Sequence, residues 1–196
     1  MRVVDLEPAA QRMAALITDV PDELLDGPTP CPEYTLGDLL DHVGGLALAF
    51  TAAATKDTAG FSSQRASGDA SRLGDDWRSR IPRDLAALAH AWCDSAAWSG
   101  MTQAGGLEVP GAVAGSIRRD QLVPQGWDVA RAAGQVYDCD PVSLDVVHGF
   151  VVQMAGPGQE AVREGLFGPV VPVPDDAPLF DRVIGLSGRH PNWSPG

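Results

Sequence analysis

Lysine and runs of basic residues are scarce in this sequence. Only one of the 14 basic residues is a lysine, Lys56, and no basic run is longer than the pair Arg118-Arg119. The formal net charge is -12. Such a chain is repelled by the phosphates of nucleic acids and by anionic lipids, because like charges repel. Nucleic-acid binding is therefore excluded from the functions that we expect.

Long hydrophobic runs are lacking as well. Gly, Asp or Arg interrupts each apolar stretch well before about 18 residues, the length of a helix that crosses a membrane. The first residues, MRVVDLEPAAQRM, carry acidic side chains early and lack the apolar segment of a signal peptide. We therefore expect a protein without a membrane partner.

Cysteine is rare, with three residues in all, Cys31, Cys93 and Cys139. An odd number of widely spaced cysteines fits neither a disulfide framework nor a structural zinc site. We expect free thiols and a cytoplasmic location. Cys31 stands just before a predicted helix, whose N-terminus can lower the pKa of a thiol, so a nucleophilic role is an alternative. The neighbouring Pro32 favours a plain thiol.

The motifs of several large enzyme classes are missing. The chain has no phosphate-binding loop, no nucleophile elbow and no dinucleotide-binding glycine motif. Instead, apolar residues recur every three or four positions, which is the spacing of helices that bury one face. The first predicted helix follows Asp5, the second starts at Thr35 and the third starts near Pro82. The fourth runs from about Val113 to Ala133, the fifth follows Asp140, and the sixth is the short segment Leu179–Leu186.

Two of these helices have clear start signals, and one has an internal break signal. Thr35 and Asp38 have the spacing of a capping box, in which each side chain accepts a bond from a free backbone N–H group. Asp140-Pro141 is a cap followed by a first helical residue. Pro124 lies inside the helix predicted at 113–133, so this helix must either kink or restart there.

The connections between the helices are long. Residues 56–80 are rich in small polar residues and predict a surface loop, and 105–115 is a glycine-rich connection. The alternating Val and Pro of 165–178 predict an extended strap, because proline cannot join a helix or a central strand. No pair of strands is convincing. We therefore predict an all-α fold in one domain, 1–196: a four-helix bundle with long crossover loops and a short C-terminal helix after the strap.

Three segments resemble a known family. TPCPEYTLGDLLDHVGG (29–45) and QGWDVARAAGQ (125–135) resemble motifs of the N-terminal domain of mycothiol-dependent maleylpyruvate isomerases. That domain belongs to the DinB-like superfamily of metal-binding four-helix bundles. FGPVVPVPDDAPLFDRVIGLSGRHPNW (167–193) resembles the tail of an uncharacterised actinobacterial branch. The resemblance implies the same bundle fold.

The resemblance also implies a site for zinc or nickel. Family members hold the metal with one His from the second helix, and with a Glu or His and a second His four residues apart on a later helix. His42 matches the first ligand, but Gln121 and Gln125 occupy the other two positions. Amide oxygens are neutral and bind these metals weakly. We therefore expect a divalent metal site that is weak or absent.

Several functions remain open at this point. The first interpretation is a DinB-like protein of unassigned activity with a degraded metal site, whose polar pocket binds a small molecule or supports a homodimer. The alternative is a metal-assisted, thiol-dependent transferase or isomerase of the mycothiol type, with the metal on His42, Gln121 and Gln125. A third hypothesis is that His148 completes a relocated site with His42.

Overall fold

The structure is a computed structural model that describes residues 5–58, 67–163 and 166–195. No helix in these ranges is both long enough and apolar enough to cross a membrane. Most of the described chain is helical, in agreement with the predicted fold class. Part of the predicted loop at 56–80 lies outside the described residues.

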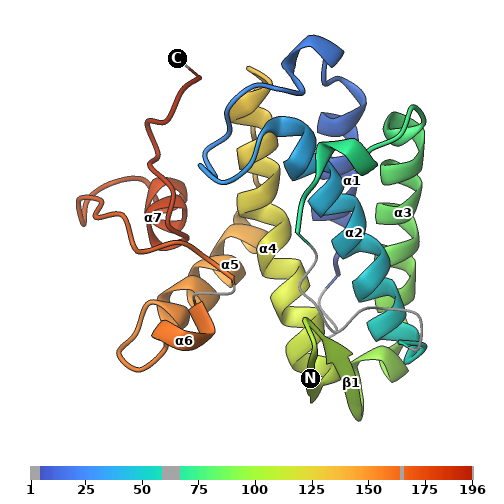
Figure 1. Cartoon of the computed structure of the whole chain (residues 1–196). Helices are drawn as coiled ribbons and strands as arrows, with labels where there is room; N and C mark the ends of the chain where they lie inside the picture. The colour runs from blue at the N-terminus through green and yellow to red at the C-terminus, as the bar shows by residue number, and fades with distance from the viewer. Residues whose placement is uncertain (1–4, 59–66, 164–165, 196) are drawn as a thin grey trace.

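Four helices form a bundle, as predicted (Figure 1). The first and second helices each pack against both the third and the fourth, but they face each other only across the diagonal. This arrangement brings the apolar faces of all four helices into one core. The bundle helices are α1 (Glu7–Thr18), α2 (Leu36–Thr55), α3 (Trp77–Trp92) and α4 (Gly111–Ala132).

The predicted start signals are present at both helices. At α2, the Thr35 hydroxyl accepts a bond from the Asp38 backbone N–H at 3.2 Å, and the Asp38 carboxylate accepts one from the Thr35 N–H at 3.0 Å. At α5 (Pro141–Met154), the Asp140 carboxylate accepts a bond from the Ser143 N–H at 2.8 Å. Both caps satisfy N–H groups that a helix start leaves without partners.

The prediction that the third helix begins near Pro82 was wrong. Helix α3 starts at Trp77, and Pro82 lies inside it. The missing N–H of Pro82 removes one helical hydrogen bond, but the turn before it buries Trp77 and Ile81 in the core. That burial explains why the helix extends to the N-terminal side of the proline.

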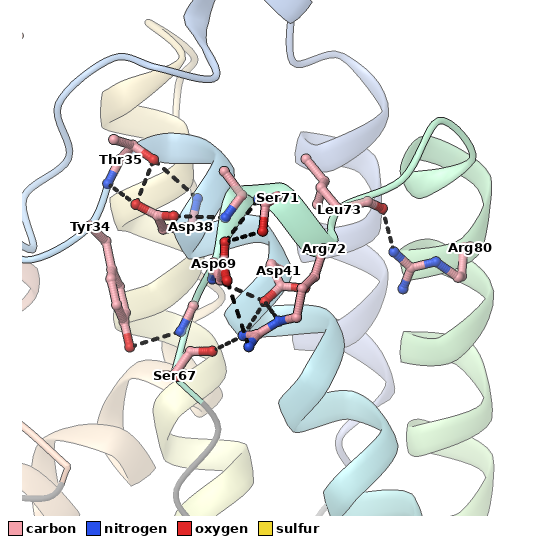
Figure 2. Close-up of polar contacts among 12 residues, drawn as sticks. Tyr34, Thr35, Asp38, Asp41, Ser67, Asp69, Ser71, Arg72, Leu73 and Arg80 are labelled. Carbon is pink, nitrogen blue, oxygen red and sulfur yellow. Dashed lines mark hydrogen bonds and ion pairs between the residues drawn. The ribbon is translucent and has the colours of Figure 1, made fainter.

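The described part of the predicted surface loop is tied to α2 by carboxylates (Figure 2). Asp38 accepts a hydrogen bond from the Ala70 N–H at 2.7 Å, and Asp41 accepts one from the Asp69 N–H at 3.1 Å. Arg72 also pairs with Asp41 at 2.8 Å. The short 3-10 helix Ala70–Arg72 is therefore fixed against the first turns of α2.

A β-hairpin stands where no pair of strands was expected. Strand β1 (Met101–Ala104) pairs antiparallel with β2 (Leu107–Pro110). The turn between them is Gly105-Gly106, and both residues have positive φ angles, 58° and 79°. Two-residue hairpin turns favour this conformation, and glycine adopts it without steric strain. The strands are too short to show an alternating pattern, so the turn was the only signal in the sequence.

Helix α4 runs through Pro124 without interruption, so the helix does not restart there. Every residue from 120 to 130 is buried. The bundle covers one side of α4, and α5 packs on the other side. Helices α7 (Leu179–Leu186) and α6 (Glu160–Arg163) both pack on α5 (Figure 1). A second apolar cluster lies there and includes Val123 of α4, Val151 of α5 and Val183 of α7.

The strap before α7 is extended, as the Val and Pro pattern predicts. Residues 167–174 form neither helix nor strand, and the Val171 N–H donates to the Gly185 carbonyl at 3.0 Å. A Cβ on Gly185 would lie only 2.3 Å from Val173, so α7 can meet the strap this closely only with glycine at that position.

Two glycines in helices give a test of the packing. A Cβ on Gly115 of α4 would lie 2.6 Å from the Trp92 ring and 2.8 Å from the Trp98 ring. We expect Gly115→Ala to destabilise the protein by about 1–3 kcal/mol, because it overfills the core. Gly149 of α5 has no atom within 4 Å of that position. Gly149→Ala should therefore stabilise the helix by roughly 0.5–1 kcal/mol. Urea unfolding of both variants measures the two effects, and equal effects would contradict this packing.

Candidate functional site

A row of polar side chains lies along one face of the buried helix α4. Arg118, Gln121, Gln125 and Asp128 follow one another at spacings of three, four and three residues, which places them on the same side of a helix. Arg118 and Asp128 are 0% exposed, and Gln121 and Gln125 are 7% and 6% exposed. Burying polar groups is unfavourable unless they find partners, so this polar row is the candidate functional site.

The lower half of the row is a guanidinium paired with an amide. Arg118 donates from Nη1 to the Gln125 Oε1 at 2.8 Å. The Arg118 Nε and Nη2 and the Gln121 Oε1 are buried and have no hydrogen-bond partner among the described residues. Burial lowers the pKa of Arg118 to about 9, which still leaves it protonated at neutral pH.

The upper half of the row is an ion pair that involves the C-terminal tail. Asp128 accepts from the Arg189 Nη2 at 2.7 Å and from its Nε at 3.1 Å. Arg189 also donates to the Ser187 carbonyl at 2.7 Å. Burial alone would lower the pKa of Arg189, but Asp128 and the nearby Cys31 thiol raise it above its usual range. The pair fixes the tail against α4.

Cys31 completes this cluster. Its thiol donates to the Asp128 Oδ2 at 3.3 Å, and its sulfur accepts from the Arg189 Nη2 at 3.4 Å. Burial, followed by the charge of Asp128, raises the pKa of the Cys31 thiol to about 12. A thiol with that pKa supplies almost no thiolate at neutral pH, so the geometry favours a packing role over a nucleophile. Cys93 and Cys139 are free thiols too, as expected.

The three residues that the family resemblance selects lie on two neighbouring helices. Gln121 and Gln125 are one turn apart on the polar face of α4. His42 is on α2, which packs against α4, and its ring lies 5.4 Å from the Tyr34 ring. His42 is half-buried. The expected elements are therefore adjacent.

The donor set does not fit a tightly bound transition metal. Two of the three positions offer amide oxygens, which are weak ligands for zinc and nickel. The Gln125 oxygen already accepts from the Arg118 guanidinium, so a metal ion there would meet a buried positive charge. Within the described ranges, no group of three His, Cys, Asp or Glu side chains could hold a metal.

The arrangement of helices does not favour the relocated site of His42 and His148. His148 lies on α5, which packs against α4 and α7. Figure 1 shows α4 between α2 and α5. An ion shared by the two imidazoles would have to lie within about 2.1 Å of a nitrogen from each ring. The two rings would therefore have to meet past α4, which lies between their helices.

The sequence interpretation missed the two arginines that define the site. Arg118 was seen only as half of a basic pair, although its spacing to Gln121 and Gln125 places all three on one face of the helix. Arg189 is 61 residues from Asp128 in the chain, and no local pattern links them.

A second buried ion pair lies on another face of α4. Asp120 is fully buried and accepts from the Arg119 Nε at 2.6 Å and from its Nη2 at 2.7 Å. Burial raises the pKa of Asp120 to about 6, and Arg119 opposes the rise only in part. Arg119 also lines a pocket of ≈ 140 Å³ between α4 and the start of α5.

Comparison with known proteins places the sequence of this chain in a family. The profile of the mycothiol maleylpyruvate isomerase N-terminal domain matches residues 6–130, which is more than half of the chain. The chain belongs to this family. The predicted resemblance to the DinB-like superfamily is thereby confirmed, and the matched region contains α1 to α3 and nearly all of α4.

Two relatives extend the similarity beyond the bundle. The uncharacterized proteins Rv0738 of Mycobacterium tuberculosis (strain ATCC 25618 / H37Rv) and MT0763 of Mycobacterium tuberculosis (strain CDC 1551 / Oshkosh) are each 31% identical to this chain over 189 residues. The matches cover 92% of this chain and 93% of each relative, so they include most of the segment after α4. No solved structure matches the chain significantly.

Removing one partner of the ion pair between Asp128 and Arg189 should strongly destabilise the protein. We expect Arg189→Met to destabilise the protein by about 3–5 kcal/mol, because Asp128 would remain buried without a partner. The control is Arg83→Met, since Arg83 is 71% exposed and lies 3.8 Å from Asp84. Its effect should stay within about 1 kcal/mol. Guanidinium chloride unfolding measures both variants, and a small effect for Arg189→Met would contradict the role given to the pair.

The raised pKa of Asp120 predicts a pH-dependent stability. The folded state binds a proton more tightly at Asp120 than the unfolded state does, so this residue opposes folding above pH 6 and stops doing so as the pH falls towards 4. Asp120→Asn removes this titrating carboxyl group. We expect the stability of the variant relative to wild type to decrease by on the order of 2 kcal/mol between pH 7 and pH 4. Urea unfolding at several pH values measures it, and a constant difference would contradict the assignment.

Proposed function

We propose that this protein is a small-molecule-binding member of its family whose site works without a tightly held transition metal. The observation that carries the proposal is the hydrogen bond from the Arg118 Nη1 to the Gln125 Oε1 at 2.8 Å. It occupies an oxygen that the metal would need. It also brings a permanent positive charge into the site from the chain itself.

The remaining polar groups support binding of a ligand. The Gln121 Oε1 and two nitrogens of Arg118 are buried without partners among the described residues. Groups of this kind oppose folding unless something else in the native protein satisfies them. Gln121 and Gln125 keep only 7% and 6% of their surface exposed, so their amides are buried as well.

The family membership supports a second candidate, a metal-assisted and thiol-dependent transferase or isomerase. It would need His42, Gln121 and Gln125 to hold a divalent metal, and Arg118 would have to release the Gln125 oxygen. The open position that three protein ligands leave would then take water or substrate. Metal content separates the two candidates.

We expect the wild-type protein, purified without added metal, to contain no stoichiometric zinc or nickel. Restoring the family ligands with Gln121→Glu and Gln125→His should create a site that binds about one equivalent of zinc or nickel, because a carboxylate and an imidazole replace two amides. Elemental analysis after dialysis against zinc or nickel measures both proteins.

Two further variants make the result specific. Adding His42→Ala to the restored protein should abolish metal binding, because His42 is the third ligand. Adding Arg118→Met instead should increase the affinity for metal, because it removes the nearby positive charge. About one equivalent of metal in the wild-type protein, lost on His42→Ala alone, would overturn the proposed function in favour of the transferase or isomerase.

A further inference from the structure

One edge of the Arg118 guanidinium has no partner among the described residues. The other side of the group is occupied, because Nη1 donates to Gln125. The Nε and Nη2 are buried, and neither has a hydrogen-bond partner in the described part of the chain. These two N–H groups point in parallel from the same edge, the arrangement that matches the two oxygens of a carboxylate.

Two other arginines of this protein use the same edge to bind carboxylates. Arg119 donates from Nε and Nη2 to the two oxygens of Asp120, at 2.6 and 2.7 Å. Arg189 donates from Nε and Nη2 to Asp128, at 3.1 and 2.7 Å. Arg118 is as deeply buried as these carboxylates, with 0% of its surface exposed, yet no acidic side chain of the described residues pairs with it.

The charge at Arg118 therefore lacks compensation. A buried guanidinium without a counter-charge destabilises the folded state, because its hydration is lost and no carboxylate replaces it. One bound carboxylate would supply one negative charge and two acceptor oxygens. Phosphate carries more charge at neutral pH and would leave the site with a net negative charge.

A second unpaired group lies one turn away on the same face. The Gln121 Oε1 is buried and can only accept a hydrogen bond. A ligand that satisfies both groups accepts two bonds at one end and donates one at the other. Small 2-hydroxy carboxylates have this pattern.

We propose that the Nε–Nη2 edge of Arg118 binds the carboxylate of a small 2-hydroxy acid, and that the Gln121 Oε1 accepts a hydrogen bond from its hydroxyl. The inference rests on the proposed function, because a metal ion bound at Gln125 would compete with Arg118 for the same place. It goes further by naming the chemical class of the ligand.

The probe for the test is glycolate, with acetate, phosphate and chloride at the same ionic strength as comparisons. Glycolate should raise the melting temperature of the full chain and shift the NMR signal of the Arg118 Nε–H group, which is assigned by its absence in Arg118→Met. Acetate should bind more weakly because it lacks the hydroxyl, and Gln121→Leu should remove this difference.

Arg118→Met should lower the affinity for glycolate by roughly 10- to 100-fold, the loss expected for hydrogen bonds to a charged group. Without ligand, its melting temperature should be no lower than that of wild type, because the variant removes an uncompensated buried charge. A purely structural Arg118 would give the opposite result. Arg118→Lys keeps the charge but lacks the paired N–H groups, so it should fold and bind glycolate weakly. Arg83→Met, which removes an exposed charge, should bind like wild type.

The inference is overturned if glycolate leaves the Arg118 signal and the melting temperature of wild type unchanged. It is also overturned if Arg118→Met responds like wild type, or if chloride and phosphate reproduce the effect. Equal binding of acetate and glycolate by the wild-type protein would remove the role given to Gln121. Metal analysis of the same preparation separates the two proposals: metal-free protein that ignores glycolate contradicts only this inference, and metal-bound protein contradicts the proposed function.

Discussion

The burial of residues 120–130 of α4 is the constraint on which the rest of this structure depends. The bundle packs on one side of the helix, and the segment after it packs on the other. No residue from 120 to 130 keeps substantial contact with water. Each polar side chain in this stretch must therefore be satisfied by the protein or by a bound molecule, because water cannot reach it freely. The position of a polar side chain on this helix thus decides whether another part of the chain satisfies it or whether it can bind a ligand.

The upper part of α4 uses its polar groups to hold the chain together. Asp128 joins the segment before α2, through Cys31, to the C-terminal tail, through Arg189. The tail is held a second time where Arg131 donates to the Trp193 carbonyl. A buried ion pair gains hydrogen bonds, but both charges lose their hydration. Its main effect is therefore to fix one arrangement of the tail rather than to add stability. The C-terminal tail is therefore fixed against α4 as part of the folded domain.

Local chemistry explains which parts of the fold the sequence predicted. The capping residues Thr35 and Asp140 act within three positions of themselves, and both predictions were correct. The apolar stripes of α1, α2 and α3 face one core and have helical periodicity. Helix α4 has no such one-sided stripe, because it is covered on both sides, and the place of Arg118 in its polar row was therefore not recognised.

The candidate site also combines features that follow from local sequence with features that only the folded chain shows. The family motif led to His42, Gln121 and Gln125, and local spacing was enough to place the two glutamines one turn apart. The partner of Gln125 could not be read from that motif, because Arg118 lies a further turn back and has no place in the family's ligand set. The pairs of Asp128 with Cys31 and Arg189 span 97 and 61 residues, and only the folded chain brings them together.

The electrostatics of the site link it to the family even though its ligands differ. A divalent metal held by one glutamate and two histidines leaves one net positive charge in the pocket, with the imidazoles counted as neutral. Here two neutral glutamines and the Arg118 guanidinium leave one net positive charge as well. A fixed guanidinium cannot activate a thiol or water as a metal does, because it has no vacant coordination position and cannot act as a Lewis acid. It can still attract and orient an anionic group. Under the proposed function, the exchange of ligands would preserve the charge that attracts an anion and would remove the metal chemistry that transforms it.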